Sequence, residues 1–254
     1  QLLQDSADSG GTYFTADDTE ELTTAFTEIL DTIIERDTSF TAPAIAVNTF
    51  NRLTHRDELF LSMFRPTNNP HWEGNVKRYR LDNTDGDKAI YDATDRPAIN
   101  PDTGTFFEDA KSYWTIGDPD GYDTTLGGFA SRLHADRNVY TVTSGATSNV
   151  TLSATANRVH EDNTALTETI LGVSAADRAG LLRWARGVDD NGEPLNILGD
   201  ALHSQPVVLS WGGSAADPDI TLFYSTNDGY FHAVDPMAGV SETMEIFSFI
   251  PQEL

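Results

Sequence analysis

The last third of the chain contains a strand, a hairpin and a further strand in close succession. Val207–Leu209 is a short apolar run, and Leu222–Ser225 is a second one. Asn227-Asp228-Gly229 then supplies a hairpin turn, and Phe231–Val234 continues the apolar alternation beyond it. A last apolar run, Glu245–Ile250, ends at a proline. This spacing predicts a sheet of four strands that follow one another along the chain.

A sheet of consecutive strands is typical of one blade of a β-propeller. We therefore expect a mainly β fold with helical insertions, in which residues 39–254 form the N-terminal part of a propeller. Hydrophobic residues make up 39% of the chain, which is enough for a sizeable core. A complete propeller needs at least about four blades, so we expect the missing blades to follow in a parent chain or to come from another chain.

The charge of the chain restricts its partners. The net charge is −24, from 40 acidic and 16 basic residues, and it argues against direct binding to nucleic acid or to an anionic membrane. It suits an extracellular, cation-rich or halophilic setting. Cysteine is absent, which excludes disulfides and thiolate metal sites. No apolar run approaches the length of a membrane span and no signal peptide opens the chain. Residues 1–4 look like the middle of a helix and residues 250–254 stop where a propeller chain would continue, so we expect an internal fragment of a longer polypeptide.

Residues 1–38 are expected to be mostly helical. Thr12–Phe14 reads as a short strand, and Asp17 and Asp18 open a helix with an apolar stripe from Leu22 to Ile34. The string GGTYFTADDTEEL before this helix resembles the last strand and helix of a von Willebrand factor A domain, and a helix that packs on any neighbour is the simpler alternative. Residues 38–43 then look like a linker.

Between the linker and the last third, strands are expected at Ala44–Phe50, Glu58–Phe64, Val76–Leu81, Ala89–Tyr91 and Arg137–Val142. Gly74-Asn75 reads as a turn that precedes the third of these. The rare basic residues nearby, Arg65, Lys77, Arg78 and Arg80, favour local ion pairs over an interaction patch.

A helix is expected after Ser174, which resembles the first residue of a capping box closed by Asp177. Leu181, Leu182 and Trp184 would form its buried face. Gly187 stands where a left-handed residue commonly ends a helix.

Calcium is the ligand that the acidic composition suggests first. A loop of the EF-hand type needs oxygen ligands before its glycine and a carboxylate at its end, and every acidic loop of this chain lacks some of them. The best weak candidates are Asp118, Asp120 and Asp123, around Gly121. Ordinary Asx turns, as also expected at Asp189, are the favoured alternative.

The six histidines form no catalytic or metal-binding motif. His203 and Ser204 are adjacent, and adjacent strand residues point to opposite faces, so they would not act as base and nucleophile. We expect His203 and His232 to be structural, and to tie neighbouring strands together through their ring nitrogens. No nucleophile elbow, phosphate loop or dinucleotide fingerprint is present.

Several strings resemble the PilY/PilC family of type IV pilus tip proteins. They are GDALHSQPVV from Gly199, STNDGYFHAVDP from Ser225 and FSFIP from Phe247, with FRP at Phe64 and WEGNVKRY at Trp72 further upstream. The strings SYWT, GGFA, RNVYT and LLRWARGVDDNG come in the order that the family leads us to expect. The resemblance covers most of residues 40–254.

The resemblance implies a non-catalytic protein that primes or caps the pilus, modulates its retraction and mediates adhesion. It implies minor pilins at the tip and a host or abiotic surface as partners. It also implies a secreted location at the cell surface, pilus tip or outer membrane of a Gram-negative bacterium. No cofactor is implied for this fragment, because the family's calcium loop belongs to a later part of the propeller, although calcium is possible in the parent protein.

A quinoprotein-like propeller dehydrogenase subunit is the alternative. The blade motif of such enzymes is matched by Asp228-Gly229, Ala233, Asp235 and Gly239, while Phe247 stands where a tryptophan would dock. Motifs of this kind hold blades together and do not mark the cofactor site, so they bear on architecture alone.

Overall fold

The computed structural model describes residues 40–45, 58–67, 71–82, 89–142, 151–214 and 217–251. The chain divides into Gln1–Thr38 and Ser39–Leu254, and every described residue lies in the second unit. The strand and helix expected within residues 1–38 lie outside the described residues. The same holds for residues 46–50 of the strand expected at Ala44–Phe50.

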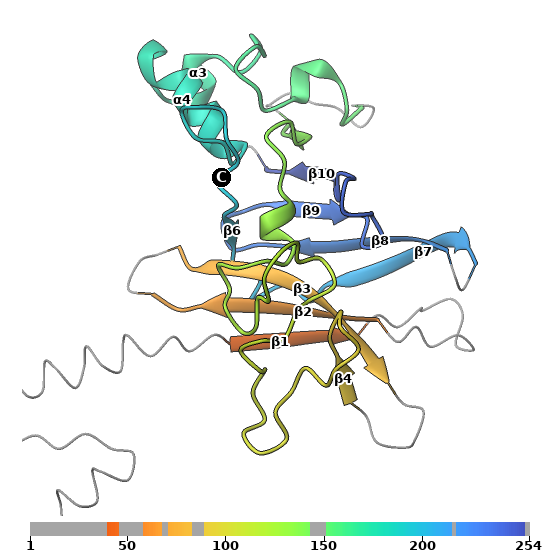
Figure 1. Ribbon diagram of the computed structural model, residues 1–254. Coiled ribbons are helices and arrows are strands. Elements are labelled where there is room, and N and C mark those ends of the chain that lie inside the picture. The colour runs from red at the N-terminus through yellow and green to blue at the C-terminus, as the bar shows by residue number, and fades with distance from the viewer. Residues whose placement is uncertain are drawn as a thin grey trace, which may run out of the picture. The chain divides into compact units, whose positions relative to one another are not determined.

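The described part is mainly β and contains two five-stranded sheets. In the first (orange to yellow in Figure 1), four antiparallel strands follow one another in chain order: β1 (Phe40–Ile45), β2 (Glu58–Arg65), β3 (Glu73–Asp82) and β4 (Ala89–Tyr91). The short strand β6 (Leu198–Gly199) pairs with the first two residues of β3.

The second sheet (blue in Figure 1) has the same plan. Its antiparallel strands are β7 (Val207–Gly213), β8 (Pro218–Ser225), β9 (Phe231–Val234) and β10 (Glu245–Phe249), and β5 (Val139–Tyr140) pairs in parallel with β10. The four strands predicted for the last third are thus confirmed, including the turn at Asn227-Asp228-Gly229. Each sheet contains one local meander of four strands.

Two expectations for the first sheet are wrong. Residues 40–43 are not a linker, because they belong to β1 and pair with β2. A proline suits this strand because β1 has a single partner strand among the described residues, and proline is found mainly on such edge strands. Gly74-Asn75 is not a turn either, because both residues lie inside β3 opposite Phe64 and Met63.

The helical segments lie between β4 and β6 in the sequence. They are the 3₁₀ turns η1 (Ala130–Arg132) and η2 (Thr155–Asn157) and the helices α3 (Glu168–Leu171) and α4 (Ala175–Ala185). Ser174 caps α4 by accepting from the backbone N–H of Asp177, and Gly187 follows in the left-handed conformation (φ 73°), as predicted. The predicted burial of Leu182 is confirmed. The predicted burial of Trp184 is wrong, because this residue is 63% exposed.

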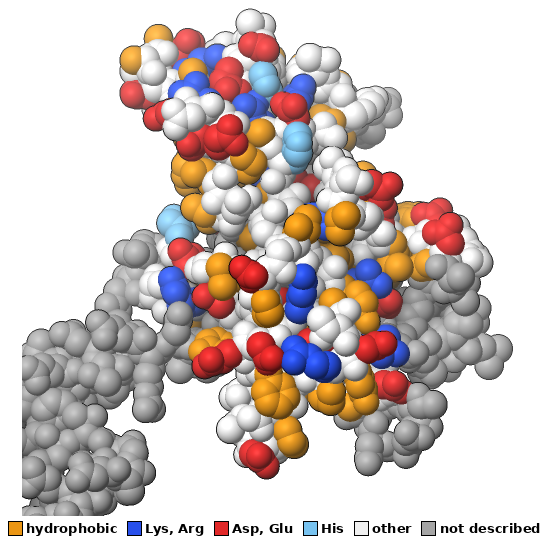
Figure 2. All heavy atoms as spheres, in the orientation of Figure 1, with side chains coloured by type: hydrophobic (Ala, Val, Ile, Leu, Met, Phe, Trp, Pro, Cys, Tyr) orange, Lys and Arg blue, Asp and Glu red, His pale blue; other side chains and the backbone are white. Residues whose placement is uncertain are grey.

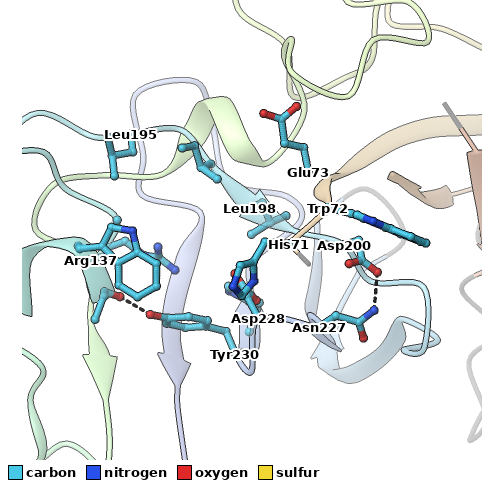
Figure 3. Close-up of a pocket in the computed structure, with 16 residues that line it drawn as sticks. His71, Trp72, Glu73, Arg137, Leu195, Leu198, Asp200, Asn227, Asp228 and Tyr230 are labelled. Atoms are coloured by element: carbon cyan, nitrogen blue, oxygen red, sulfur yellow. Dashed lines mark hydrogen bonds between the residues drawn. The ribbon is translucent and has the colours of Figure 1, made fainter. Parts of the chain in front are cut away.

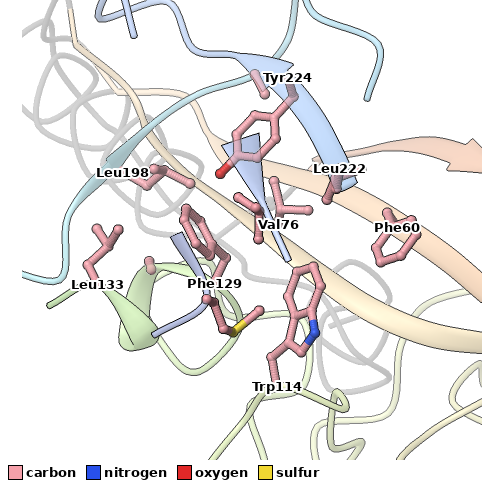
Figure 4. Packing of buried hydrophobic residues seen from close by; sticks show 12 residues of the cluster. Phe60, Val76, Trp114, Phe129, Leu133, Leu198, Leu222 and Tyr224 are labelled. Carbon is pink, nitrogen blue, oxygen red and sulfur yellow. The ribbon is translucent and has the colours of Figure 1, made fainter. Parts of the chain in front are cut away.

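One apolar cluster joins the two sheets (Figure 4). Phe60 and Val76 enter it from the first sheet, and Leu222, Tyr224 and Val234 enter it from the second. The loop between β4 and β5 adds two large aromatic side chains, those of Trp114 and Phe129. Because burial of apolar area stabilises a fold, this cluster favours the association of the two sheets.

Strand β2 is buried on both faces. Side chains alternate along β2, so Phe60 faces the joint cluster while Leu59, Leu61 and Met63 face the other way. There they meet Tyr79 and a covering excursion that contributes Phe106 and Ala110. A third cluster packs α4, through Leu182, against Val139 of β5 and Tyr230. No helix among the described residues is long and apolar enough to cross a membrane.

The close approach of β6 to β3 requires a glycine at position 74, inside a strand. A Cβ atom at this position would lie 2.4 Å from the carbonyl oxygen of Gly199 and 2.5 Å from the Cα of Asp200. We expect Gly74→Ala to lower the free energy of unfolding by about 1–3 kcal/mol, because β6 must move away from β3. Gly180→Ala is the matched control, since it has open space inside α4 and is expected to add up to about 1 kcal/mol. Chemical denaturation measures both, and equal stability of Gly74→Ala and the wild type would contradict the close approach.

Candidate functional site

A cavity of about 280 Å³ lies where the end of α4, residues 195–200 and the β8–β9 turn come together (Figure 3). The start of β3 and Arg137 complete its lining. These segments are far apart in the sequence, and two of them carry the strings that resemble the PilY/PilC family. The cavity is therefore the candidate site of the described part.

The two strings bond directly to one another. The backbone N–H of Asn227 donates to the carbonyl of Asp200 at 2.7 Å, and the Asn227 side chain donates to Asp200 Oδ1 at 2.6 Å. Asp200 N in turn donates to the carbonyl of Trp72 at 3.2 Å. Gly199 has no room for a side chain, because a Cβ would lie 2.4 Å from Asp228 Cγ. The resembling residues thus lock the first sheet to the hairpin of the second.

A buried ion pair lies beside the cavity. Arg137 Nε and Nη2 donate to the two carboxylate oxygens of Glu245 at 2.6 and 2.7 Å. His232 Nδ1 lies 2.9 Å from Glu245 Oε1, and because a carboxylate only accepts, this nitrogen carries the proton. Burial alone would raise the pKa of Glu245, but the hydrogen bond from His232 and the charge of Arg137 prevail and lower it to about 2.

His232 belongs to an aromatic stack as well as to this network. Its ring lies 4.9 Å from that of Tyr224 and 5.9 Å from that of Tyr230. Since His232 is in β9 and Glu245 in β10, the prediction that this histidine ties neighbouring strands is confirmed. The same prediction for His203 is wrong, because His203 lies exposed in a turn and outside every strand.

A hydroxyl, an imidazole and a carboxylate lie in succession at Thr226, His232 and Glu245, and Thr226 Oγ1 is 3.4 Å from His232 Nε2. In hydrolases this order activates a nucleophile. Here Thr226 donates its hydroxyl proton to Asp228 Oδ1 and is itself buried, while Arg137 already neutralises Glu245. The hydroxyl proton is therefore taken by Asp228 and the imidazole proton by Glu245, so neither is directed at a substrate.

The weak calcium candidates surround a cation that the chain supplies itself. Lys77 Nζ donates to the carbonyl oxygens of Asp120, Gly121 and Asp123 at 2.8, 3.1 and 2.7 Å, and lies 3.0 Å from Asp120 Oδ2. Lys77 and Asp120 are both fully buried. Burial lowers the pKa of Lys77, and the charge of Asp120 partly offsets this shift. The loop binds an ammonium group in the way that such loops bind a metal ion.

The three candidate carboxyl groups have separate surroundings. Asp118 is exposed, and Asp123 Oδ1 accepts from the backbone N–H and hydroxyl of Thr125 at 2.7 Å. That is an Asx turn, as expected, and Asp189 forms another with the backbone of Asn191. Within the described ranges, no three His, Asp or Glu side chains converge as metal ligands would. A calcium site at these residues stays a prediction.

The remaining basic residues of the first sheet form local ion pairs, as the sequence favours. Arg65 pairs with Glu73, Arg78 with Glu58, and Arg80 with Asp95, at 2.9, 2.6 and 2.6 Å. Figure 2 shows Lys and Arg side chains lying beside Asp and Glu across the visible face. These pairs are partly exposed and individually contribute little.

Sequence reasoning misses the importance of Arg137, Glu245 and Trp184 for this site. A glutamate that opens an apolar strand is the signal that could have marked Glu245, since a buried carboxylate needs a partner. The partner, Arg137, is 108 residues away in the chain, and only the packing of β5 beside β10 brings the two together.

Comparison of the whole chain with protein-family models, curated proteins and solved structures found no match.

The cradle around Lys77 makes a testable prediction about stability. Lys77→Met would leave Asp120 buried without its counter-charge, and we expect a loss of about 3–5 kcal/mol in the free energy of unfolding. The double variant Lys77→Met/Asp120→Asn should lose less than the sum of the single variants, because the two groups are coupled. Lys111→Met, at a partly buried lysine whose Nζ makes one exposed hydrogen bond to the carbonyl of Gly117, should change stability by no more than about 1 kcal/mol. Strict additivity in urea denaturation would contradict the pairing.

The low pKa of Glu245 predicts how stability depends on pH. A carboxyl whose folded-state pKa is about 2, against an ordinary 4.5, adds stability that is fully present above about pH 4.5 and is lost as the pH falls towards 2. The shift corresponds to about 3 kcal/mol. Glu245→Gln should be less stable at pH 7 and should flatten the loss in this window, whereas Glu193→Gln, at an exposed site, should not. Parallel acid profiles for wild type and Glu245→Gln would refute the assignment.

Proposed function

We propose that this chain is part of a PilY/PilC-like type IV pilus tip protein, in which residues 39–254 form the first blades of a quinoprotein-like β-propeller. In this role it primes or caps the pilus, modulates retraction and takes part in surface attachment. Its partners would be minor pilins at the tip and a host or abiotic surface, at the exterior of a Gram-negative bacterium.

One observation carries the proposal. The strings that resemble the family, at Gly199–Asp200 and Asn227–Asp228, bond to each other and connect two sheets that each contain a meander of four strands. Four consecutive antiparallel strands are the unit of a propeller blade, and an apolar cluster between two such units is the contact that neighbouring blades make. The resemblance therefore falls on residues whose role in the described fold is structural, as a scaffold requires.

We also propose that the chain is not an enzyme. The polar groups that could have been catalytic, Thr226, His232 and Glu245, are buried, and their hydrogen bonds run to Asp228, to each other across His232 and Glu245, and to Arg137. A quinoprotein-like dehydrogenase subunit is the competing function. Addition of pyrroloquinoline quinone with an alcohol and an electron acceptor should give no turnover, and turnover would favour the dehydrogenase.

The location of the protein tests the proposal most directly. An antibody raised against this chain should detect the parent protein in appendages sheared from the producing cells. The signal should disappear from the sheared fraction of a strain that lacks the major pilin, because the protein would then have no pilus to travel on. A signal confined to the cytosol, or one in the sheared fraction that is indifferent to the loss of pilin, would overturn it.

A further inference from the structure

The cavity at the junction of the two strings has an open apolar wall. Trp184 and Ile197 line it with side chains that are 63% and 59% exposed, and Leu195 and Leu198 lie beside them. Large apolar side chains left this exposed in a concave site are a feature of ligand-binding pockets. A volume of about 280 Å³ suits one small molecule or one inserted side chain.

Two carboxylates offer free oxygen atoms to this cavity. Asp200 is only 4% exposed, and its Oδ1 accepts from Asn227 Nδ2 and from the backbone N–H of Leu202. Asp228 Oδ1 accepts from Thr226. Within the described part of the chain, neither Asp200 Oδ2 nor Asp228 Oδ2 forms a hydrogen bond, and both residues line the cavity (Figure 3). Neither oxygen is sealed from solvent, so each is accessible to a hydrogen-bond donor from a ligand.

Arg137 offers the cavity a hydrogen-bond donor from another element. The Arg137 side chain is 5% exposed, and its Nε and Nη2 are taken by Glu245 and Ser248. Its Nη1 has no hydrogen-bond partner among the described residues, although Arg137 lines the cavity. The bidentate pair fixes the guanidinium plane, so this N–H is held in place to meet a carbonyl oxygen.

The charge of the lining decides which ligands fit. Glu245 neutralises Arg137, while Asp200 and Asp228 remain without a basic partner in the described ranges. An anion would meet this negative lining in a chain whose net charge is −24. A cation would be attracted to it and would also gain from the exposed face of an indole ring.

We propose that this cavity binds an organic cation with an apolar stem, namely a primary ammonium or guanidinium group such as ends a lysine or arginine side chain. The cationic head reaches Asp200 and Asp228, the stem lies along Trp184, and a carbonyl next to the stem accepts from Arg137 Nη1. This proposal does not depend on the pilus function, because it rests on the lining of the cavity alone.

Isothermal titration calorimetry with the whole chain tests the proposal. The probes are N-acetyl-lysine N-methylamide, its arginine counterpart, and N-acetyl-norleucine N-methylamide, which keeps most of the stem and lacks the charge. The cationic probes should bind, more weakly as salt is added, and the norleucine probe should bind at least about tenfold more weakly. Equal affinity for the neutral probe, or no binding of either cation at millimolar concentration, would overturn the proposal.

Two pairs of variants locate the binding. Asp228→Asn should weaken binding about tenfold or more, whereas Asp219→Asn, at an exposed residue of β8, should not. Trp184→Ala should weaken it about threefold to tenfold, and Trp211→Ala, at an equally exposed tryptophan outside the cavity, should leave it unchanged. Trp184 is exposed, so its replacement leaves the fold intact. Binding that survives both cavity variants would place the cation elsewhere and refute the site.

A further titration distinguishes a polypeptide side chain from a free amine as the source of the cation. 1,5-Diaminopentane offers two ammonium groups on an apolar stem and no carbonyl. If the protected lysine binds more tightly, and Arg137→Lys removes the difference while circular dichroism confirms folding, the ligand is a side chain of a polypeptide. If the diamine binds as tightly, the ligand is a free amine, and the proposed hydrogen bond from Arg137 Nη1 to a carbonyl is overturned while the cation site at Asp200 and Asp228 stands.

Discussion

The hydrogen bonds between Asp200 and Asn227 are the constraint on which the rest of the structure depends. They join residue 200, which follows the last strand of the first sheet, to the hairpin of the second. Gly74 and Gly199 permit this approach, because a Cβ atom at either position would collide with the facing segment. The apolar cluster lies between the same two sheets, and the cavity beside the junction is lined by the same segments.

Buried cations organise the rest of this acidic chain. Lys77 binds the carbonyl oxygens of the loop at residues 120–123, and Arg137 binds Glu245 between β5 and β10. The desolvation cost of each cation is offset by the hydrogen bonds that it donates to a fixed set of oxygen atoms. With 16 basic residues against 40 acidic ones, the chain places two of its few cations where they hold loops and strands rather than on the surface.

Much of the fold could be predicted from local patterns. The hairpin at Asn227-Asp228-Gly229 and the strands on either side of it follow from turn chemistry and alternation, which are local properties. The cap of α4 at Ser174 is local in the same sense. Predictions failed where a contact between distant segments decides. Gly74 looks like a turn residue but lies in a strand, and it is a glycine because β6 approaches it closely.

The sequence by itself determined the mainly β character, the consecutive strands of the second sheet and the structural role of His232. Only the tertiary structure decided that the Lys77 ammonium group lies beside Asp120, where the acidic loop suggests a calcium ion, and that Arg137 pairs with Glu245. It also decided that Trp184 is left exposed over a cavity. The physical reason is the range of the interactions. Alternation and turns depend on neighbours along the chain, whereas a buried charge finds its partner only when separate segments pack together.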